Sequence, residues 1–170
     1  DDMLWPEDGT VAAAANDHRK AGWWAIDTFN PNIWSHAAEY LSRSSADFAV
    51  FQETKSLDGE CRSTEAAMRG KGWTTAVTSG ELAAGGGRSA GVAVACRKHI
   101  GMSWSLGDDA MPQELKHRLS IRWCGGMCKG RFHLATIYLF SGVGMGKRNL
   151  DLMQLVAGVL VSLNGRWVLA

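Results

Sequence analysis

The chain alternates short runs of large apolar residues with segments of helical periodicity and with glycine-rich loops. Residues 23–29 predict a first strand, and Asn32 is expected to cap a helix that runs to about Ser44. Four apolar residues of this segment have the spacing of one buried helical face: Ile33, Ala37, Tyr40 and Leu41. The pattern therefore predicts a strand followed by an amphipathic helix.

A compact apolar run from Phe48 to Phe51, set between Asp47 and Gln52, is typical of a strand that is buried on both faces. Such a strand is expected near the centre of a sheet. A short helix at about 59–69 and a flexible loop at 80–88 are expected before the next buried strand, 90–95. The other strands are expected at 73–78, 102–106, 117–124 and 131–140.

A last helix is predicted over 149–163, with Gly165 ending it before a final strand at 166–170. Six apolar residues form its expected stripe: Leu152, Leu155, Val156, Val159, Leu160 and Leu163. Strands outnumber helices in this reading, and they occur in meanders as well as in strand-helix-strand units. The order of elements favours a layered α/β sandwich of mixed sheets over a doubly wound parallel sheet.

Composition adds limits to this picture. A length of 170 residues with 46% hydrophobic and 21% charged residues fits one domain. Eighteen Lys and Arg against 17 Asp and Glu leave a net charge of +1, so any nucleic-acid binding would have to be local. We expect no membrane span. The four cysteines match no disulfide framework, which favours an intracellular protein without fixing its compartment.

The two ends of the sequence suggest how the domain is organised. Residues 1–21 are expected to form a poorly structured lead-in, and residues 22–170 a partial domain. The first residue is not Met, and the last four residues form an apolar run that resembles a strand cut off part-way. We therefore expect the chain to be a fragment whose domain is truncated before its second half is complete.

Glu53 is the first candidate for chemistry, because it directly follows the buried run and Gln52. A carboxylate at the carboxyl end of a central strand is where open α/β folds place groups that handle ligands. The alternative is a charge that only marks the solvent edge of the strand.

Asn30 is the second candidate, since it ends the first predicted strand. Neighbouring strands would bring its amide to the same sheet edge as Glu53, and such an oxygen-rich setting suits Mg²⁺. The alternative is a turn-forming residue beside Pro31.

These residues resemble the endonuclease/exonuclease/phosphatase superfamily, which includes DNases, abasic-site endonucleases and retrotransposon endonucleases. The phrase Ala46-Asp47-Phe48-Ala49-Val50-Phe51-Gln52-Glu53-Thr54-Lys55 is similar to the strand that leads to the family's metal-binding glutamate. Phe29-Asn30-Pro31-Asn32 resembles the end of its first strand, and the segments at 89–94, 132–139 and 148–170 resemble later parts. The resemblance covers about residues 23–170.

The resemblance implies a DNase-like fold, a four-layer α/β/β/α sandwich of mixed, largely antiparallel sheets. It implies that Glu53 ligates Mg²⁺ or Mn²⁺ and that Asn30, or alternatively Asn32, supports the metal and the phosphate. Tyr138 would reach the scissile phosphate. In this chemistry a metal ion polarises a phosphoryl oxygen while water attacks in line.

Two family motifs do not occur in the chain: the Gly-Asp-x-Asn phrase and the closing Asp-His segment that supplies the general base. The carboxyl-terminal half of the domain is therefore expected to be missing. For this reason we expect hydrolysis by the 170-residue chain itself to be absent or very weak.

Two arginines are candidate phosphate contacts, because a guanidinium can hold a phosphate through two parallel hydrogen bonds. Arg88 follows a run of three glycines, and Arg148 begins the last predicted helix. The alternative for each is a solvated surface side chain.

The leading hypothesis is part of a Mg²⁺-dependent phosphodiester hydrolase, most simply an endonuclease acting on nucleic acid and including the retrotransposon-like type. A phosphoinositide phosphatase or a sphingomyelinase-like enzyme of the same superfamily is the first alternative. A non-catalytic binding domain or remnant is the second. The sequence does not separate DNA, RNA and phosphoinositide substrates.

Overall fold

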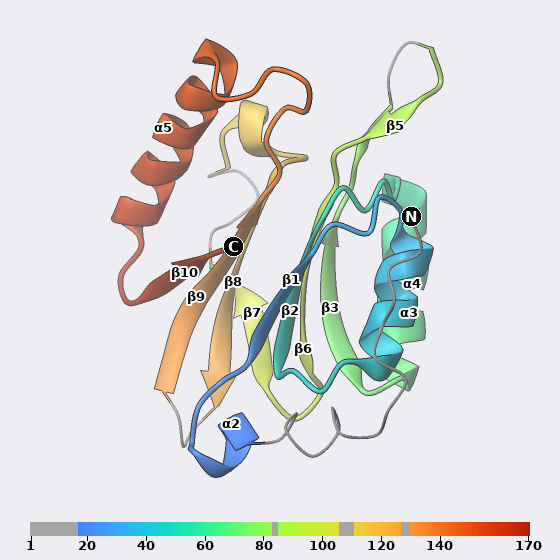
Figure 1. Cartoon of the computed structure of the whole chain (residues 1–170), viewed down its shortest axis with the longest axis vertical. Coiled ribbons are helices and arrows are strands. Elements are labelled where there is room, and N and C mark those ends of the chain that lie inside the picture. Colours follow the sequence, from blue (N-terminus) through green and yellow to red (C-terminus); the bar gives the residue numbers. More distant parts are fainter. Residues whose placement is uncertain (1–16, 83–84, 106–110, 127–129) are drawn as a thin grey trace.

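Two four-stranded sheets form the centre of the computed structural model, which describes residues 17–82, 85–105, 111–126 and 130–170 (Figure 1). The first sheet has the order β1 (Ile26–Phe29), β2 (Phe48–Gln52), β6 (Val92–Arg97) and β3 (Trp73–Thr78). The second has the order β10 (Trp167–Leu169), β9 (Gly130–Ile137), β8 (Leu119–Gly126) and β7 (Gly101–Trp104). In each sheet one edge pair is parallel and the other pairs are antiparallel.

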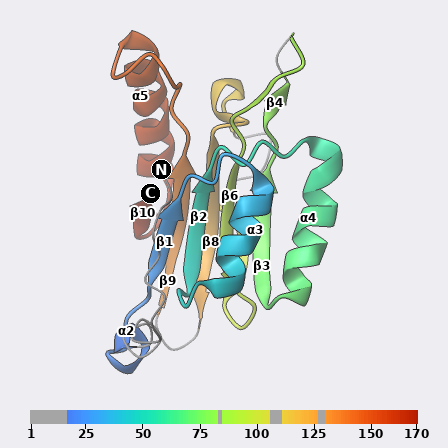
Figure 2. The same ribbon diagram turned by 45° about the vertical axis from the view of Figure 1, so that its right-hand side comes forward.

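Helices cover the outer faces of both sheets. Helices α3 (Trp34–Arg43) and α4 (Asp58–Gly70) lie side by side over the first sheet, and α5 (Lys147–Ser162) lies over the second (Figure 2). A short 3₁₀ helix, η2 (Gln113–Leu115), contributes Leu115 to the core beneath α5. The four-layer α/β/β/α arrangement expected from the resemblance is confirmed.

Three apolar clusters hold these layers together. The cluster around Phe51 and Trp73 lies between the first sheet and its helices, and the cluster around Ile121 and Val156 lies under α5. The middle cluster fills the space between the sheets with seven buried residues: Phe48, Val50, Val94, Cys96, Ile100, Cys124 and Leu134. The run from Phe48 to Phe51 is fully buried, as predicted, because alternate side chains enter two different clusters.

The helical stripes differ from the sequence expectation at their margins. Ala37 and Leu41 are buried on α3, but Ile33 precedes the helix and is 47% exposed. On α5, Leu152, Val156 and Leu160 are buried, whereas Leu155 is 39% exposed, because it lies one residue off the face that meets the sheet.

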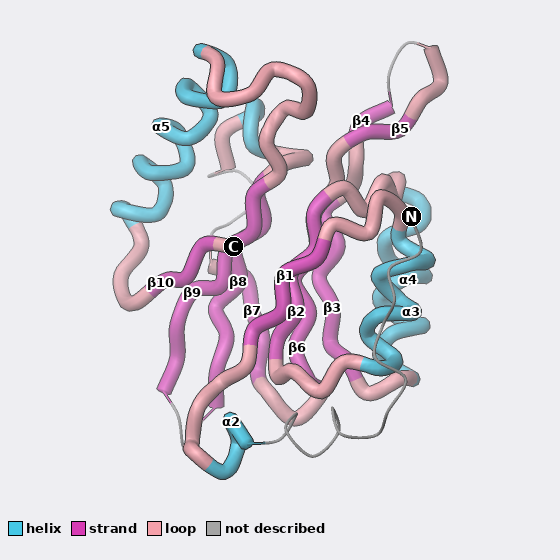
Figure 3. The backbone as a smooth tube through the Cα atoms, viewed as in Figure 1, coloured by secondary structure: helices cyan, strands magenta, loops and turns pink. Residues whose placement is uncertain are grey.

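A hairpin that was not predicted interrupts the glycine-rich loop. Strands β4 (Glu81–Leu82) and β5 (Arg88–Ser89) pair with each other and extend beyond the first sheet (Figure 3). Their two-residue length is too short to produce a period in the sequence. The hairpin places Glu81 and Arg88 close to other parts of the chain.

Part of the expected lead-in is ordered against the core. Helix α2 (Asp17–Lys20) places Arg19 Nε 3.1 Å from Oδ1 of the buried Asp47. His18 Nε2 lies 3.2 Å from the other oxygen of the same carboxylate. Residues 17–20 thus form one helical turn within the lead-in that was expected to be poorly structured, and residues 1–16 lie outside the described part. None of the described helices is long and apolar enough to cross a bilayer.

Candidate active site

Asn30 and Glu53 meet where β1 and β2 end. The two strands are parallel and in register, with Phe29 opposite Phe51, so the residues that follow them emerge at one edge of the sheet. The Asn30 side-chain nitrogen, Nδ2, lies 3.3 Å from Oε2 of Glu53. The structure thus brings together the two candidates that the sequence placed at this edge.

The Asn30 amide is oriented by a second hydrogen bond. The backbone N–H of Asn32 donates to Asn30 Oδ1 over 3.2 Å. Because this N–H can only donate, the amide oxygen must face it and the NH₂ group must face Glu53. Asn30 therefore acts on Glu53 as a hydrogen-bond donor that holds one carboxylate oxygen.

Lys55 completes this arrangement on the other side of the carboxylate. Its Nζ lies 3.2 Å from Glu53 Oε1 and also donates a hydrogen bond to Oδ1 of Asn32. The Lys55 and Glu53 side chains are 24% and 21% exposed, so solvent and small ligands can reach the pair. The sequence analysis did not single out Lys55, although a lysine two residues after Glu53 is close enough along the chain to suggest an ion pair with it.

The backbone of this site is left-handed at three positions that carry side chains. Asn32, Glu53 and Lys55 have φ values of 61°, 58° and 54°. This region costs about 1–2 kcal/mol for an ordinary residue and less for Asn. The sequence expectation that Asn32 caps α3 is wrong: Ile33 is the N-cap, with no side-chain cap bond, and the Asn32 side chain turns to Lys55 instead.

The segment after β2 is held in this conformation by the chain that leads into β6. The N–H groups of Thr54 and Lys55 donate to the carbonyls of Gly91 and Ala90 over 2.9 and 3.1 Å. Gly91 has φ of 80°, and a Cβ there would lie 2.7 Å from Thr54 Oγ1. Position 91 therefore requires glycine, and the close approach fixes where Glu53 and Lys55 lie.

Gln52 connects the site to the second sheet. Its Nε2 donates to Thr136 Oγ1 on β9 over 3.0 Å and to Thr28 Oγ1 on β1 over 3.2 Å. Tyr138 follows Thr136 by two residues, so it emerges at the same end of the space between the sheets. Its O–H lies 3.4 Å from Ser141 Oγ, and its N–H donates to the Arg118 carbonyl.

Arg118 is a buried guanidinium next to Tyr138 that sequence reasoning missed. Its Nη2 donates to Glu81 Oε2 over 3.1 Å, and its guanidinium carbon lies 3.8 Å from the centroid of the Phe140 ring. Within the described residues, Nε and Nη1 have no hydrogen-bond acceptor. Buried donors of this kind are normally satisfied by water or by a ligand.

The two arginines proposed as phosphate contacts have different surroundings. Arg148 is exposed and stacks on the Phe140 ring, 3.4 Å from its centroid. Arg88 donates to both oxygens of Glu60 over 3.0 and 2.9 Å. The Leu57 N–H and then Arg88 hold the pKa of Glu60 below its usual range. Arg88 is therefore engaged in an ion pair, whereas Arg148 carries its charge at the surface.

The donor set at Glu53 fits a weakly held hard cation. In the described part of the chain, no three His, Cys, Asp or Glu side chains gather as a metal cluster. Mg²⁺ nevertheless often uses only one or two carboxylates and completes its shell with water and substrate phosphate. Glu53 can supply one such carboxylate through Oε1, once the Lys55 ammonium is displaced.

Comparisons with known proteins identify the fold. The chain matches no protein-family model and no curated protein. It is similar to the structure of D. rerio TDP2 humanized by 14 mutations, with TM-score 0.56 and 12% identity, over 86% of this chain and 59% of that one. It is also similar to D. rerio TDP2 complexed with a single-strand DNA product, with TM-score 0.56 and 13% identity, over 86% of this chain and 58% of that one.

A third similar structure is ANGEL2, described as a 2′,3′-cyclic phosphatase, with TM-score 0.51 and 12% identity, over 81% of this chain and 47% of that one. The chain thus spans 47% to 59% of the length of these proteins. At such identities the likeness concerns the fold, and it confirms the DNase-like architecture expected from the sequence.

Proposed function

We propose that this chain contributes the metal-binding side of the active site of a Mg²⁺- or Mn²⁺-dependent phosphodiester hydrolase that acts on nucleic acid. The contact between Asn30 and Glu53 at the end of two parallel strands carries the proposal. It is supported by the shared fold with TDP2, one structure of which holds a single-strand DNA product.

In this proposal each residue has a defined part. Glu53 would hold the cation through Oε1, while Asn30 fixes the carboxylate by donating a hydrogen bond to Oε2. When bound, such a cation would supply Lewis-acid polarisation of a phosphoryl oxygen and would neutralise charge that develops during attack by water. Tyr138 donates its O–H to the phosphate, and Arg148 offers a surface charge to the neighbouring backbone of the substrate.

A non-catalytic phosphate-binding domain is the second candidate. The observation that favours it is the ion pair between Glu53 and Lys55, which neutralises the candidate metal ligand. The two candidates differ in whether the chain binds a divalent cation through Glu53, and this difference can be measured without any assay of hydrolysis.

The decisive experiment is a titration of the chain with Mn²⁺, followed by electron paramagnetic resonance of the free ion. Glu53→Gln keeps the shape of the side chain and is expected to weaken Mn²⁺ binding at least about tenfold, because it removes the anionic ligand. Glu39→Gln is the matched control, since Glu39 is 59% exposed on α3 and pairs only with Arg43 among the described residues. Unaltered Mn²⁺ binding by Glu53→Gln would overturn the proposal, as would a wild-type chain that binds no Mn²⁺.

A further inference from the structure

The Lys55 ammonium stands in the position that a cation would take beside Glu53. It lies 3.2 Å from Oε1, the carboxylate oxygen that Asn30 leaves free, and its second partner is the neutral oxygen of Asn32. A metal ion that binds Oε1 must therefore first separate Lys55 from Glu53.

The net charge of the four side chains at this site also disfavours a metal ion that competes with Lys55 for Glu53. Glu53 contributes one negative charge and Lys55 one positive charge, while Asn30 and Asn32 are neutral. No other carboxylate joins them as part of a metal cluster in the described ranges. A divalent cation thus approaches a group of zero net charge, and its binding gains little from Coulomb attraction unless another anion arrives with it.

The displaced ammonium cannot move far from the site. The Lys55 N–H is bound to the Ala90 carbonyl over 3.1 Å, and the residue is fixed in the left-handed region with φ of 54°. Its flexible four-carbon stem nevertheless lets the charged end turn away from Oε1. A freed ammonium at this position is a receptor for an anionic oxygen, and the anion that accompanies the metal in the proposed function is a phosphate.

We infer that Lys55 is a positioning residue whose ammonium is paired with Glu53 in the resting site and turns to pair with a phosphate oxygen when a metal ion binds. Metal and phosphate therefore bind cooperatively. This inference rests on the proposed function, because it takes Glu53 as the metal ligand. It adds a consequence that the proposed function lacks: the resting chain binds metal weakly, and phosphate strengthens that binding.

The test uses the same Mn²⁺ titration, with and without millimolar inorganic phosphate as the probe. Lys55→Met removes the competing charge and keeps an unbranched side chain. It is expected to tighten Mn²⁺ binding at least about fivefold without phosphate and to abolish the strengthening by phosphate seen in the wild-type chain. Lys55→Arg keeps the charge and is expected to retain weak binding of Mn²⁺ alone, which separates an effect of charge from an effect of side-chain shape.

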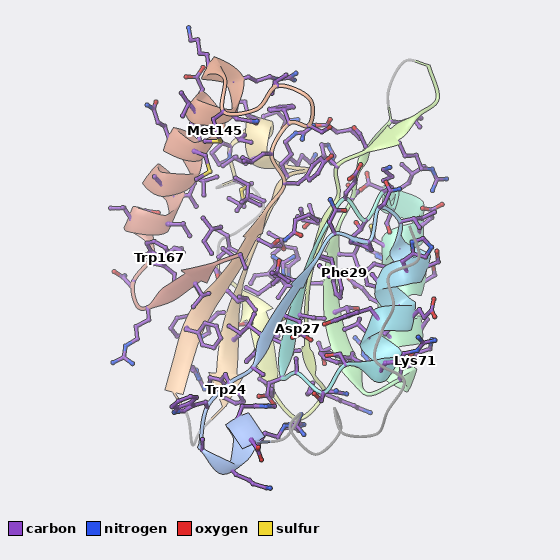
Figure 4. All side chains as sticks on the ribbon, in the orientation of Figure 1. Trp24, Asp27, Phe29, Lys71, Met145 and Trp167 are labelled. Atoms are coloured by element: carbon purple, nitrogen blue, oxygen red, sulfur yellow. The ribbon has the colours of Figure 1, made fainter. Side chains whose placement is uncertain are left out.

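Lys71→Met is the matched control, because it removes the same charge at the far end of the first sheet. Lys71 is exposed at the lower end of α4, whereas β2 ends at the upper end of the sheet (Figure 4). This variant is expected to bind Mn²⁺ as the wild-type chain does, in the presence and absence of phosphate.

The outcomes distinguish the inference from the function on which it rests. If Glu53→Gln loses Mn²⁺ while Lys55→Met binds it no more tightly than the wild-type chain, the inference is overturned and the proposed function stands. If phosphate strengthens Mn²⁺ binding equally in the wild-type and Lys55→Met chains, the inference is likewise overturned. If Glu53→Gln binds Mn²⁺ normally, both fall together.

Discussion

The two ends of the space between the sheets differ in what fills them. At the lower end, where Figure 4 labels Trp24, the rings of Trp24 and Phe132 each pack edge-on against Phe48, with ring centroids 5.3 Å apart in both pairs. At the upper end, Gln52 bonds to Thr136, and Arg118 and Ser120 have buried polar atoms without partners among the described residues.

The contrast assigns different physical tasks to the two ends. Apolar burial at the lower end stabilises the contact between the sheets, at roughly 25 cal/mol per Å² of apolar surface removed from water. The upper end holds charged and hydroxyl groups that gain less from burial, and its backbone is strained at Glu53 and Lys55. Proteins commonly accept such local instability where a ligand is to be bound.

The largest loss of stability is expected for Phe48→Ala at the lower end. Because Phe48 is fully buried, the change is expected to lower the free energy of unfolding by about 3–5 kcal/mol. Gln52→Ala at the upper end is expected to lower it by only about 2 kcal/mol, since Gln52 loses two neutral hydrogen bonds. Urea unfolding measures both, and equal losses would contradict the division of tasks.

Alkaline unfolding gives a second test, to which two buried thiols at the lower end contribute. Burial raises the pKa of Cys96 and Cys124 to about 12, from 9.0 in solvent. Between these values the unfolded chain releases both protons and the folded chain keeps them, so stability falls as pH rises. The expected slope is about 1.4 kcal/mol per pH unit per thiol.

The control for the alkaline experiment is the double variant Cys96→Ala with Cys124→Ala. It is less stable at neutral pH because it leaves cavities, but its free energy of unfolding should depend less steeply on pH between about 9 and 12. An unchanged slope would show that other groups produce the alkaline loss.

The smallest predicted effect is a gain in stability from a substitution at the upper end. Thr54 is buried, and its Oγ1 has no hydrogen-bond partner in the described part of the chain. Thr54→Val keeps the shape and removes the unpartnered hydroxyl, so the free energy of unfolding is expected to rise by about 1 kcal/mol. Thr136→Val, which removes an acceptor of Gln52, is expected to lower it by a similar amount. A loss in Thr54→Val would refute the idea that this end is under-satisfied.

The fold could be predicted wherever burial imposed a clear pattern. The strand expected at 73–78 is observed with those bounds, and the strand around Phe48 extends by one residue to Gln52. The expected cap at Asn32 failed because α3 begins one residue later than a cap at Asn32 requires, and the Asn32 oxygen instead accepts a hydrogen bond from Lys55, 23 positions away. Local sequence carries no information about such a distant partner.

The candidate site shows the same limit. Glu53 and Asn30 could be placed together, because the ends of parallel neighbouring strands coincide. The pairing of Arg88 with Glu60 spans 28 positions and passes through a hairpin that the sequence did not reveal. Arg118 was missed because a charged residue inside a predicted strand is ordinarily taken to face solvent.

The bonds of Gln52 to Thr28 and Thr136 have a mechanical meaning for the residue that follows. The Gln52 side chain is hydrogen-bonded to both sheets, and Glu53 is the next residue along the chain. Any sliding of one layer over the other would be passed on to the carboxylate as a change in its direction. The orientation of the Glu53 carboxylate therefore depends on how the two sheets are packed, and substitutions that shift one sheet far from the site are expected to change it.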